Sequence, residues 1–234
     1  MSTAKTIRKT HRYLGLFTGI QFLLWTISGL YFSWTDINDI HGDLYKITKK
    51  ERAFEQLIGL SELQFKDKIT SVELRDIIGT PYYWINNKQL VNAYTGILKK
   101  GITATEAVSI AKEHIIKSLK VKDVVLLETV EKHHEYREKK IPVYVISYKG
   151  NDAIKAYVSK EDGKFQTIRH SKWRIFDFLW MTHTMDYEGR DNINTLTLRI
   201  FSLVGCFTVI SGFVLYFNSS KTLRRLKKRI YKNQ

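Results

Sequence analysis

Cysteine is almost missing from this chain of 234 residues, and the one present, Cys206, lies within an apolar run. An intrachain disulfide is therefore excluded, so any exported domain must be stabilised by its hydrophobic core alone. The sequence also lacks the G-x-S-x-G, H-E-x-x-H and C-x-x-C motifs and a glycine-rich phosphate loop. Their absence removes the usual sequence support for hydrolytic, zinc-protease, dithiol or nucleotide chemistry.

Charged residues are missing from two long stretches. Residues 15–34 read GLFTGIQFLLWTISGLYFSW, twenty residues without Asp, Glu, Lys or Arg. A second stretch is predicted over 196–217, and its apolar part, 200–217, is also uncharged. Because a helix rises ~1.5 Å per residue, about twenty residues cover the ~30 Å hydrocarbon core of a bilayer, and the second stretch is just long enough. We therefore predict two transmembrane helices.

A cleaved signal peptide would also combine a basic start with an apolar middle. The first apolar run is longer than the ~7 to 15 residues typical of a signal peptide. It ends in Tyr31, Phe32 and Trp34 instead of the small residues of a cleavage site. We interpret residues 15–34 as an uncleaved anchor.

Acidic residues are missing from both ends of the sequence. Residues 1–14 contain four Lys or Arg and residues 218–234 contain seven, so these ends supply eleven of the fifteen net positive charges. Because the basic runs adjoin apolar stretches, the positive-inside rule places both ends in the cytoplasm and the middle of the chain outside it. Anionic membrane lipid is then the expected partner of the basic residues. Nucleic-acid binding is not expected, since this charge does not line a domain face.

The middle of the chain combines helical and strand-like patterns. Residues 103–119 form the best helix, with Glu106 in the first turn and either Thr103 or Thr105 as the cap. Two strands are expected around a turn at 86–88. Four further strand-like segments occupy 121–130, 141–148, 153–158 and 164–169. We predict an α+β fold in which one helix covers an antiparallel sheet.

An aromatic segment precedes the second apolar stretch. Trp173, Trp180 and His183 lie at helical spacing, which suits an amphipathic helix at the membrane interface. A helix packed on its own domain would show the same pattern, and the sequence does not distinguish the two. Trp34 and Arg199 are expected at the outer edges of the two spans.

These patterns give an order of six segments. They are a cytoplasmic N-terminus (1–14), a first span (15–34), an extracytoplasmic domain (35–172), an interfacial helix with a loop (173–190), a second span (196–217) and a cytoplasmic tail (218–234).

Short motifs beside the spans carry a resemblance to a known family. The sequence THRYLG at 10–15 precedes the first span and WMTH at 180–183 precedes the second. The spans share a texture, with TISGLYFSW at 26–34 and VISGFVLYF at 209–217. The chain thereby resembles the PepSY-associated transmembrane family of bacterial inner-membrane proteins. The resemblance implies an exported PepSY-like module, in which a helix is followed by antiparallel strands and an acidic-glycine turn.

The resemblance implies functions of two kinds. Larger members with four spans resemble haem-containing reductases of imported iron-siderophores, with histidines near their span ends. Other PepSY proteins resemble peptide-binding modules that restrain or assist proteases. Because this chain has two spans, the resemblance favours a subunit over an independent reductase.

Three histidines are candidate haem ligands. His11 and His183 match the family's span-edge histidines, at the cytoplasmic and outer faces, and His41 is also on the outer side. A six-coordinate haem b needs two axial ligands at one iron, so histidines on opposite faces cannot share it. One scheme pairs His11 with His11 of a second copy, which Gly15 and Gly19 would support as a close helix contact. Another pairs His183 with His41. In the alternative interpretation, His11 is part of the basic flank and His183 is an interfacial residue whose ring lies at headgroup depth.

The other histidines have simpler interpretations. His133 and His134 lie in EKHHEYREKK, which we interpret as a solvated loop at a hairpin tip. His114 is expected to pack on its helix. His170 belongs to a basic cluster expected near the membrane surface.

Two functions from different classes follow. The first is an inner-membrane accessory or haem-b electron-transfer subunit in iron or siderophore uptake, a component of a ferric-siderophore reductase, acting as a homodimer or with another membrane protein. The second is a membrane-anchored module without redox chemistry that binds a peptide or protein through an exposed edge strand. It would modulate a protease or form a structural subunit of an envelope complex.

Overall fold

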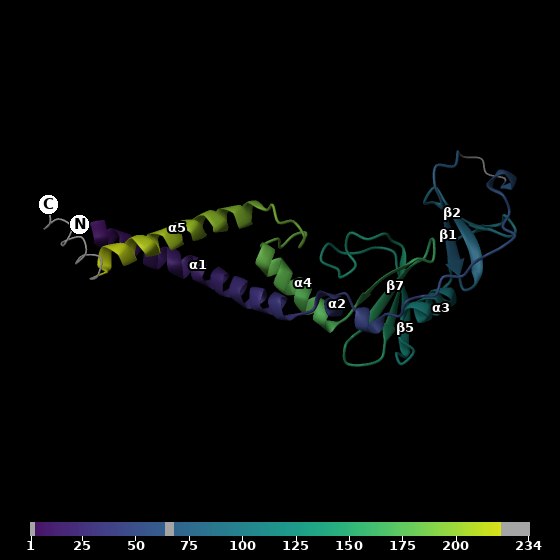
Figure 1. Ribbon diagram of the computed structural model, residues 1–234, viewed down its shortest axis with the longest axis horizontal. Helices are drawn as coiled ribbons and strands as arrows, with labels where there is room; N and C mark the ends of the chain where they lie inside the picture. The colour runs from purple at the N-terminus through teal and green to yellow at the C-terminus, as the bar shows by residue number, and fades with distance from the viewer. Residues whose placement is uncertain (1–2, 64–67, 221–234) are drawn as a thin grey trace. The chain divides into compact units, whose positions relative to one another are not determined.

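The computed structural model describes residues 3–63 and 68–220, and Figure 1 shows their elements. The chain divides into a helical unit, Met1–Trp34 with Asp177–Gln234, and an α+β unit, Thr35–Phe176. The predicted tail at 218–234 lies outside the described residues from position 221 onward.

Five α-helices and two four-stranded antiparallel sheets are present within the described residues. The helices are α1 (Thr3–Trp34), α2 (Ile37–Ile40), α3 (Ala104–His114), α4 (Ser171–Thr184) and α5 (Leu196–Ser219). The strands are β1 (Val72–Ile77), β2 (Thr80–Ile85), β3 (Gln89–Asn92), β4 (Leu98–Lys99), β5 (Val121–Leu127), β6 (Val143–Tyr148), β7 (Lys155–Ser159) and β8 (Phe165–Arg169). The two 3-10 helices are η1 (Asp43–Tyr45) and η2 (Leu60–Glu62). The predicted α+β class with antiparallel strands is confirmed.

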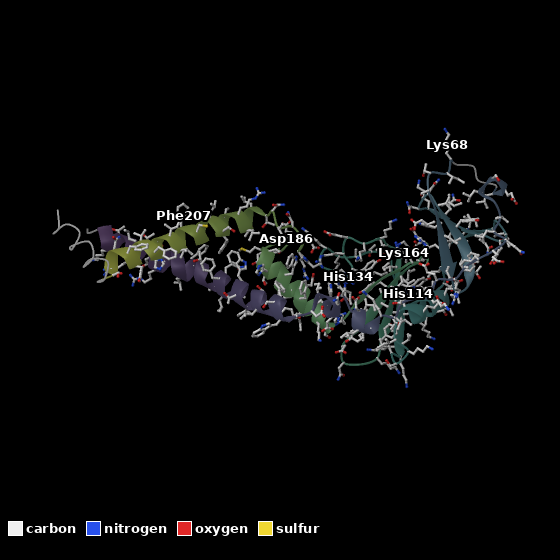
Figure 2. All side chains as sticks on the ribbon, in the orientation of Figure 1. Lys68, His114, His134, Lys164, Asp186 and Phe207 are labelled. Carbon is white, nitrogen blue, oxygen red and sulfur yellow. The ribbon has the colours of Figure 1, made fainter. Side chains whose placement is uncertain are left out.

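In the helical unit, α1 and α5 are long and apolar enough to cross a membrane, by length and composition. They pack antiparallel (Figure 1), with the rings of Phe17 and Phe201 stacked at 5.2 Å between centroids. Large side chains elsewhere on these helices face outward: Leu16 is 73% exposed and Phe207, labelled in Figure 2, is 64% exposed. Continuous exposed apolar surface of this kind suits a lipid environment.

The first sheet of the α+β unit has the strand order β1-β2-β3-β4. The hairpin between β2 and β3 turns at Asn86 and Asn87, whose φ angles are 53° and 55°. Asparagine tolerates this left-handed conformation better than most residues, which explains why the turn forms there. The two predicted strands and their turn are confirmed.

The second sheet has the order β5-β6-β7-β8, with α3 against one face. Ile146 and Tyr148 of β6 face α3, whereas Val143 belongs to a cluster on the opposite face. Residues of the first sheet, such as Trp84, join the core under α3, so both sheets share it. Gly163 lies in the β7–β8 turn with φ 67°, and a Cβ there would lie 3.2 Å from Ile110 Cδ1. The turn therefore requires glycine for both conformation and space.

The helix predicted over 103–119 is shorter in the structure. Thr103 caps α3: its Oγ1 accepts the Glu106 backbone N–H and the Glu106 carboxylate accepts the Thr103 N–H, a capping box. Ile115 is extended instead of helical and forms an antiparallel bridge with Lys46. Backbone pairing with the segment after η1 therefore ends the helix early.

Candidate functional site

His11 lies in α1 and contacts α5. Its Nδ1 is 2.7 Å from Oγ of Ser211, and the Ser211 hydroxyl lies 2.7 Å from the carbonyl oxygen of Thr208. The next residue, Gly212, leaves room for the ring, because a Cβ there would lie 3.2 Å from His11 Cε1. A serine and a glycine of α5 thus hold this imidazole.

His183 lies in the last turn of α4 and contacts α1. Its Nδ1 is 2.7 Å from Oγ of Ser28, whose hydroxyl lies 2.7 Å from the carbonyl oxygen of Leu24. The His183 ring also packs edge-on against Phe32, with centroids 5.5 Å apart, and against Trp25 at 6.4 Å. This imidazole therefore lies beside residues of the apolar run 15–34.

Side chains of α1 also satisfy the C-terminal end of α4. Nε2 of Gln21 donates to the carbonyl of Thr182 at 2.9 Å, and Nε1 of Trp25 donates to the carbonyl of His183 at 2.8 Å. The last carbonyls of a helix have no partner within that helix, and leaving them unpaired in apolar surroundings costs several kcal/mol. These two bonds fix the position of His183 along α1.

A polar stripe connects the two histidine contacts along α1. Thr18, which is fully buried, lies between them, with its hydroxyl oxygen 3.5 Å from that of Thr208. His11, Thr18, Gln21 and Ser28 are separated by seven, three and seven residues, the spacing of one helix face. His11 and Ser28 are 17 residues apart, which in a helix corresponds to ~26 Å. The two imidazoles therefore lie at separate levels along α1.

Asp186, labelled in Figure 2, accepts hydrogen bonds from the backbone of the loop between α4 and α5. The Asp186 carboxylate accepts backbone N–H groups of Glu188, Gly189 and Asn192 at 3.3, 3.0 and 2.8 Å. Asp177, buried in α4, forms an ion pair with Arg190 of this loop. Asp177 and Asp186, the acidic residues near His183 in the sequence, therefore both bind groups of this loop.

The α+β unit contains a partly buried charge cluster at Glu135. Its carboxylate accepts hydrogen bonds from Arg174 Nε at 2.7 Å, Lys155 Nζ at 2.7 Å and the Tyr157 hydroxyl at 2.8 Å. Burial alone would raise the pKa of Glu135, but these donors outweigh it and lower the pKa to about 2. The neighbouring Tyr136 is fully buried and stacks on Tyr157, with centroids 4.5 Å apart.

The structure corrects two predictions about charged segments, one for the loop that contains His133 and one for His170. The solvated-loop prediction holds for exposed His133 but is wrong for Tyr136, because the loop folds back over the sheet. His170 does not belong to a surface cluster: it is 1% exposed, and its Nε2 is 3.1 Å from the carbonyl oxygen of Ile40. The ring of His114, expected to pack on its own helix, stacks instead on Phe165 of β8, with centroids 4.6 Å apart.

The other predicted site residues are dispersed. His41 is exposed just after α2, in the α+β unit. Trp34, the last residue of α1, is 85% exposed, and Arg199 is exposed in the first turn of α5. Trp180 packs on Phe32 with centroids 5.8 Å apart, whereas the guanidinium of Arg169 lies 3.9 Å above the Trp173 ring in the α+β unit.

Sequence reasoning missed the serines that hold the histidines. A signal was present, because Ser28 and Ser211 each stand in an Ile-Ser-Gly triplet, and these triplets form part of the texture shared by the two apolar runs. The pairing could not be inferred from it, since the contact joins residues 155 and 200 positions apart. Glu135 was missed because its neighbours in the sequence are charged.

Comparison with protein-family models, curated proteins and solved structures finds no match for this chain. Among the described residues, no group of three or more His, Cys, Asp or Glu side chains is arranged to hold a metal ion.

Proposed function

We propose that this protein is a member of the PepSY-associated transmembrane family and acts as an accessory or electron-transfer subunit in iron or siderophore uptake. In this proposal α1 and α5 span the bacterial inner membrane, and the α+β unit is the exported PepSY-like domain. The helix α3 followed by β5 to β8, with its acidic turn before Gly163, supports the likeness to that module.

The observation that carries the proposal is the hydrogen bonding of the two histidine rings, in which, within the described residues, one nitrogen is bonded and the other is not. His11 and His183 each have Nδ1 hydrogen bonded to a serine hydroxyl at 2.7 Å. Among residues 3–63 and 68–220, Nε2 of neither ring has a hydrogen bond. A histidine that binds a metal usually shows this arrangement, with one ring nitrogen held by the protein and the other directed to the ion.

Haem b is the group that we propose for these positions. His11 and His183 would each supply one axial nitrogen, at two sites, and the bound group would supply reversible one-electron transfer. The protein's own contribution is to orient each imidazole, through Ser211 and Gly212 at one site and through Ser28 and Phe32 at the other. The apolar faces of α1 and α5 would exclude water from both sites.

Each site needs a second axial ligand, because the two histidines lie at different levels of α1. A homodimer would supply His11 from the second copy. At the outer site, His183 of the second copy would be the second ligand. A Cβ at Gly15 or Gly19 would meet nothing within 4 Å in this chain, so that face of α1 has room for a second helix.

The orientation follows from charge. The contact between His11 and Ser211 brings the basic end of α1 and the C-terminal end of α5 together. Lys5, Arg8, Lys9 and Arg12 lie at this end. By the positive-inside rule, we propose that this end lies in the cytoplasm and the α+β unit on the periplasmic side.

The test is a visible spectrum of the full-length protein, purified in detergent from haem-replete cells, before and after dithionite reduction, with haem quantified per chain. With one haem at each of the two sites of a homodimer, we expect a b-type spectrum at about one haem per chain. His11→Ala and His183→Ala should each remove about half of that haem, whereas His133→Ala, on the exposed loop, should remove none. A blank spectrum of the unaltered protein would overturn the redox proposal.

One observation favours the alternative function, a peptide- or protein-binding module. The strand β5 is at the edge of the second sheet, and its Val125 is 51% exposed. An edge strand with an exposed apolar side chain can add a strand from another chain. Replacing Val125 with Lys should abolish capture of such a partner and leave any haem spectrum unchanged, which separates the two functions.

A further inference from the structure

The two histidine contacts in the helical unit have the same local geometry. In one, His183 of α4 meets Ser28 in the Ile-Ser-Gly triplet of α1. In the other, His11 of α1 meets Ser211 in the Ile-Ser-Gly triplet of α5. In both, the ring nitrogen concerned is Nδ1 and its distance to the serine Oγ is 2.7 Å.

The direction of each hydrogen bond follows from counting protons. A serine hydroxyl has one proton to donate and two lone pairs that accept. The Ser28 hydroxyl lies 2.7 Å from the carbonyl oxygen of Leu24, and the Ser211 hydroxyl 2.7 Å from that of Thr208. A carbonyl oxygen only accepts, so the one proton of each serine is committed to its own helix. Each serine can then only accept from the imidazole, and Nδ1 must carry the N–H.

A neutral imidazole carries one N–H, so placing it on Nδ1 leaves the lone pair on Nε2. Only a neutral imidazole binds a metal ion, so the proposed role as a ligand concerns this form of the two rings. The lone pair on Nε2 is the electron pair that an iron ion requires.

We infer that Ser28 and Ser211 are positioning residues that hold His183 and His11 in the Nδ1–H tautomer, with Nε2 free to bind a metal. The role of Nε2 as a ligand rests on the proposed function, whereas the tautomer itself does not. The two serines act through the histidines and do not contact the bound group.

Matched control serines exist on the same helices. Ser33 of α1 and Ser219 of α5 are exposed, and their hydroxyls also bond to carbonyls of their own helices, those of Leu30 and Leu215. They share the backbone bond of Ser28 and Ser211 but not the contact with an imidazole. Replacing them measures the cost of losing a helical serine alone.

The first test uses nitrogen NMR of the haem-free, full-length protein with ¹⁵N-labelled histidine, in detergent at neutral pH. The nitrogen shifts report which ring atom carries the proton. We expect His11 and His183 to be Nδ1–H tautomers, unlike the exposed His133. Ser28→Ala should change the signals of His183 alone and Ser211→Ala those of His11 alone. Ser33→Ala and Ser219→Ala should change neither.

The second test loads the same variants with haem. Loss of the bond at Nδ1 should weaken haem binding at the affected site by about 10- to 100-fold, the usual effect of removing such a partner. Ser211→Thr, which keeps a hydroxyl, should restore binding at the His11 site. Retention of haem by Ser28→Ala and Ser211→Ala at the level of the unaltered protein would overturn the positioning role.

The two proposals fail in different ways. Nε2–H tautomers at His11 and His183, or signals insensitive to Ser28→Ala and Ser211→Ala, would overturn the inference even in a haem protein. Nδ1–H tautomers in a protein that binds no haem would support the role of the serines and overturn the proposed function. Circular dichroism of each variant confirms that the helices are intact.

Discussion

At the residue scale, Glu135 joins three side chains of the α+β unit in one hydrogen-bonded cluster. Its side chain is 11% exposed and accepts hydrogen bonds from Arg174, Lys155 and Tyr157. Glu135→Gln keeps the shape but leaves two partly buried cations without a counter-charge, so we expect it to destabilise the unit by about 2 kcal/mol. Thermal unfolding of the full-length protein measures this, with a melting temperature lower by about 5 °C. Glu131→Gln, on the exposed part of the same loop, is the control and should change little.

The same residue makes a prediction about pH. The pKa of Glu135 is about 2 in the folded protein and 4.5 when the carboxyl is unperturbed. Because the folded state favours the carboxylate, its contribution is complete above about pH 4.5 and is lost as the pH falls toward 2. The difference in pKa corresponds to about 3 kcal/mol. Melting temperatures of the unaltered protein and of Glu135→Gln should therefore converge as the pH is lowered from 7 to 3. A constant gap would contradict this.

How far the sequence predicts such residues depends on where their partners lie. The histidines at 11 and 183 were candidates because they match the span-edge histidines that the family resemblance implies. Nothing local distinguishes Glu135 from the exposed charges around it, since its partners Arg174, Lys155 and Tyr157 are 20 to 39 positions away. Ser28 and Ser211 are hidden for the same reason, within runs that read simply as apolar.

At the scale of elements, the start of α3 was predictable and its end was not. The start depends on a capping box between Thr103 and Glu106, which is local in sequence. The end depends on the bridge between Lys46 and Ile115, which joins segments far apart. The β-strands show the same contrast: the sequence indicated where most of them lie, whereas their division into two sheets depends on pairing across the whole unit.

The capping box gives a direct test of the choice that the sequence left open. Thr103→Ala removes the acceptor for the Glu106 N–H and should destabilise the α+β unit by about 1 kcal/mol. Thr105→Ala is the matched control, because Thr105 is exposed within the first turn, and it should be neutral within about 0.5 kcal/mol. Denaturation monitored by circular dichroism measures both. Equal effects would show that Thr103 is not the dominant cap.

The packing of α1 on α5 can be tested with a pair of glycines in equivalent triplets. A Cβ at Gly212 would lie 3.2 Å from His11 Cε1, whereas a Cβ at Gly29 would meet nothing within 4 Å. Gly212→Ala should therefore displace the His11 ring and lower the haem bound at that site, while Gly29→Ala should leave the His183 site intact. Haem quantification and the ¹⁵N signals of the two histidines report each site separately. An unchanged His11 signal in Gly212→Ala would show that the ring has room to spare.

At the scale of the whole molecule, the proposed function requires a particular topology, which charge predicts. The basic residues at the start of α1 should remain in the cytoplasm, and the α+β unit should lie on the opposite side of the membrane. The antiparallel contact between α1 and α5 is consistent with two crossings, since it brings the basic flank of α1 beside the end of α5. Composition alone does not distinguish this from a chain lying entirely on one side.

Site-specific labelling decides between these arrangements. Cys206 is exposed on α5, so Cys206→Ala provides a background without thiols. In that background, Glu131→Cys in the exposed loop should react with a membrane-impermeant maleimide in spheroplasts. Lys5→Cys should react only after the membrane is permeabilised. The reverse pattern would invert the protein and place His183 at the cytoplasmic face. Protection of both positions would mean that the α+β unit is not exported, and periplasmic iron uptake would then be excluded as its role.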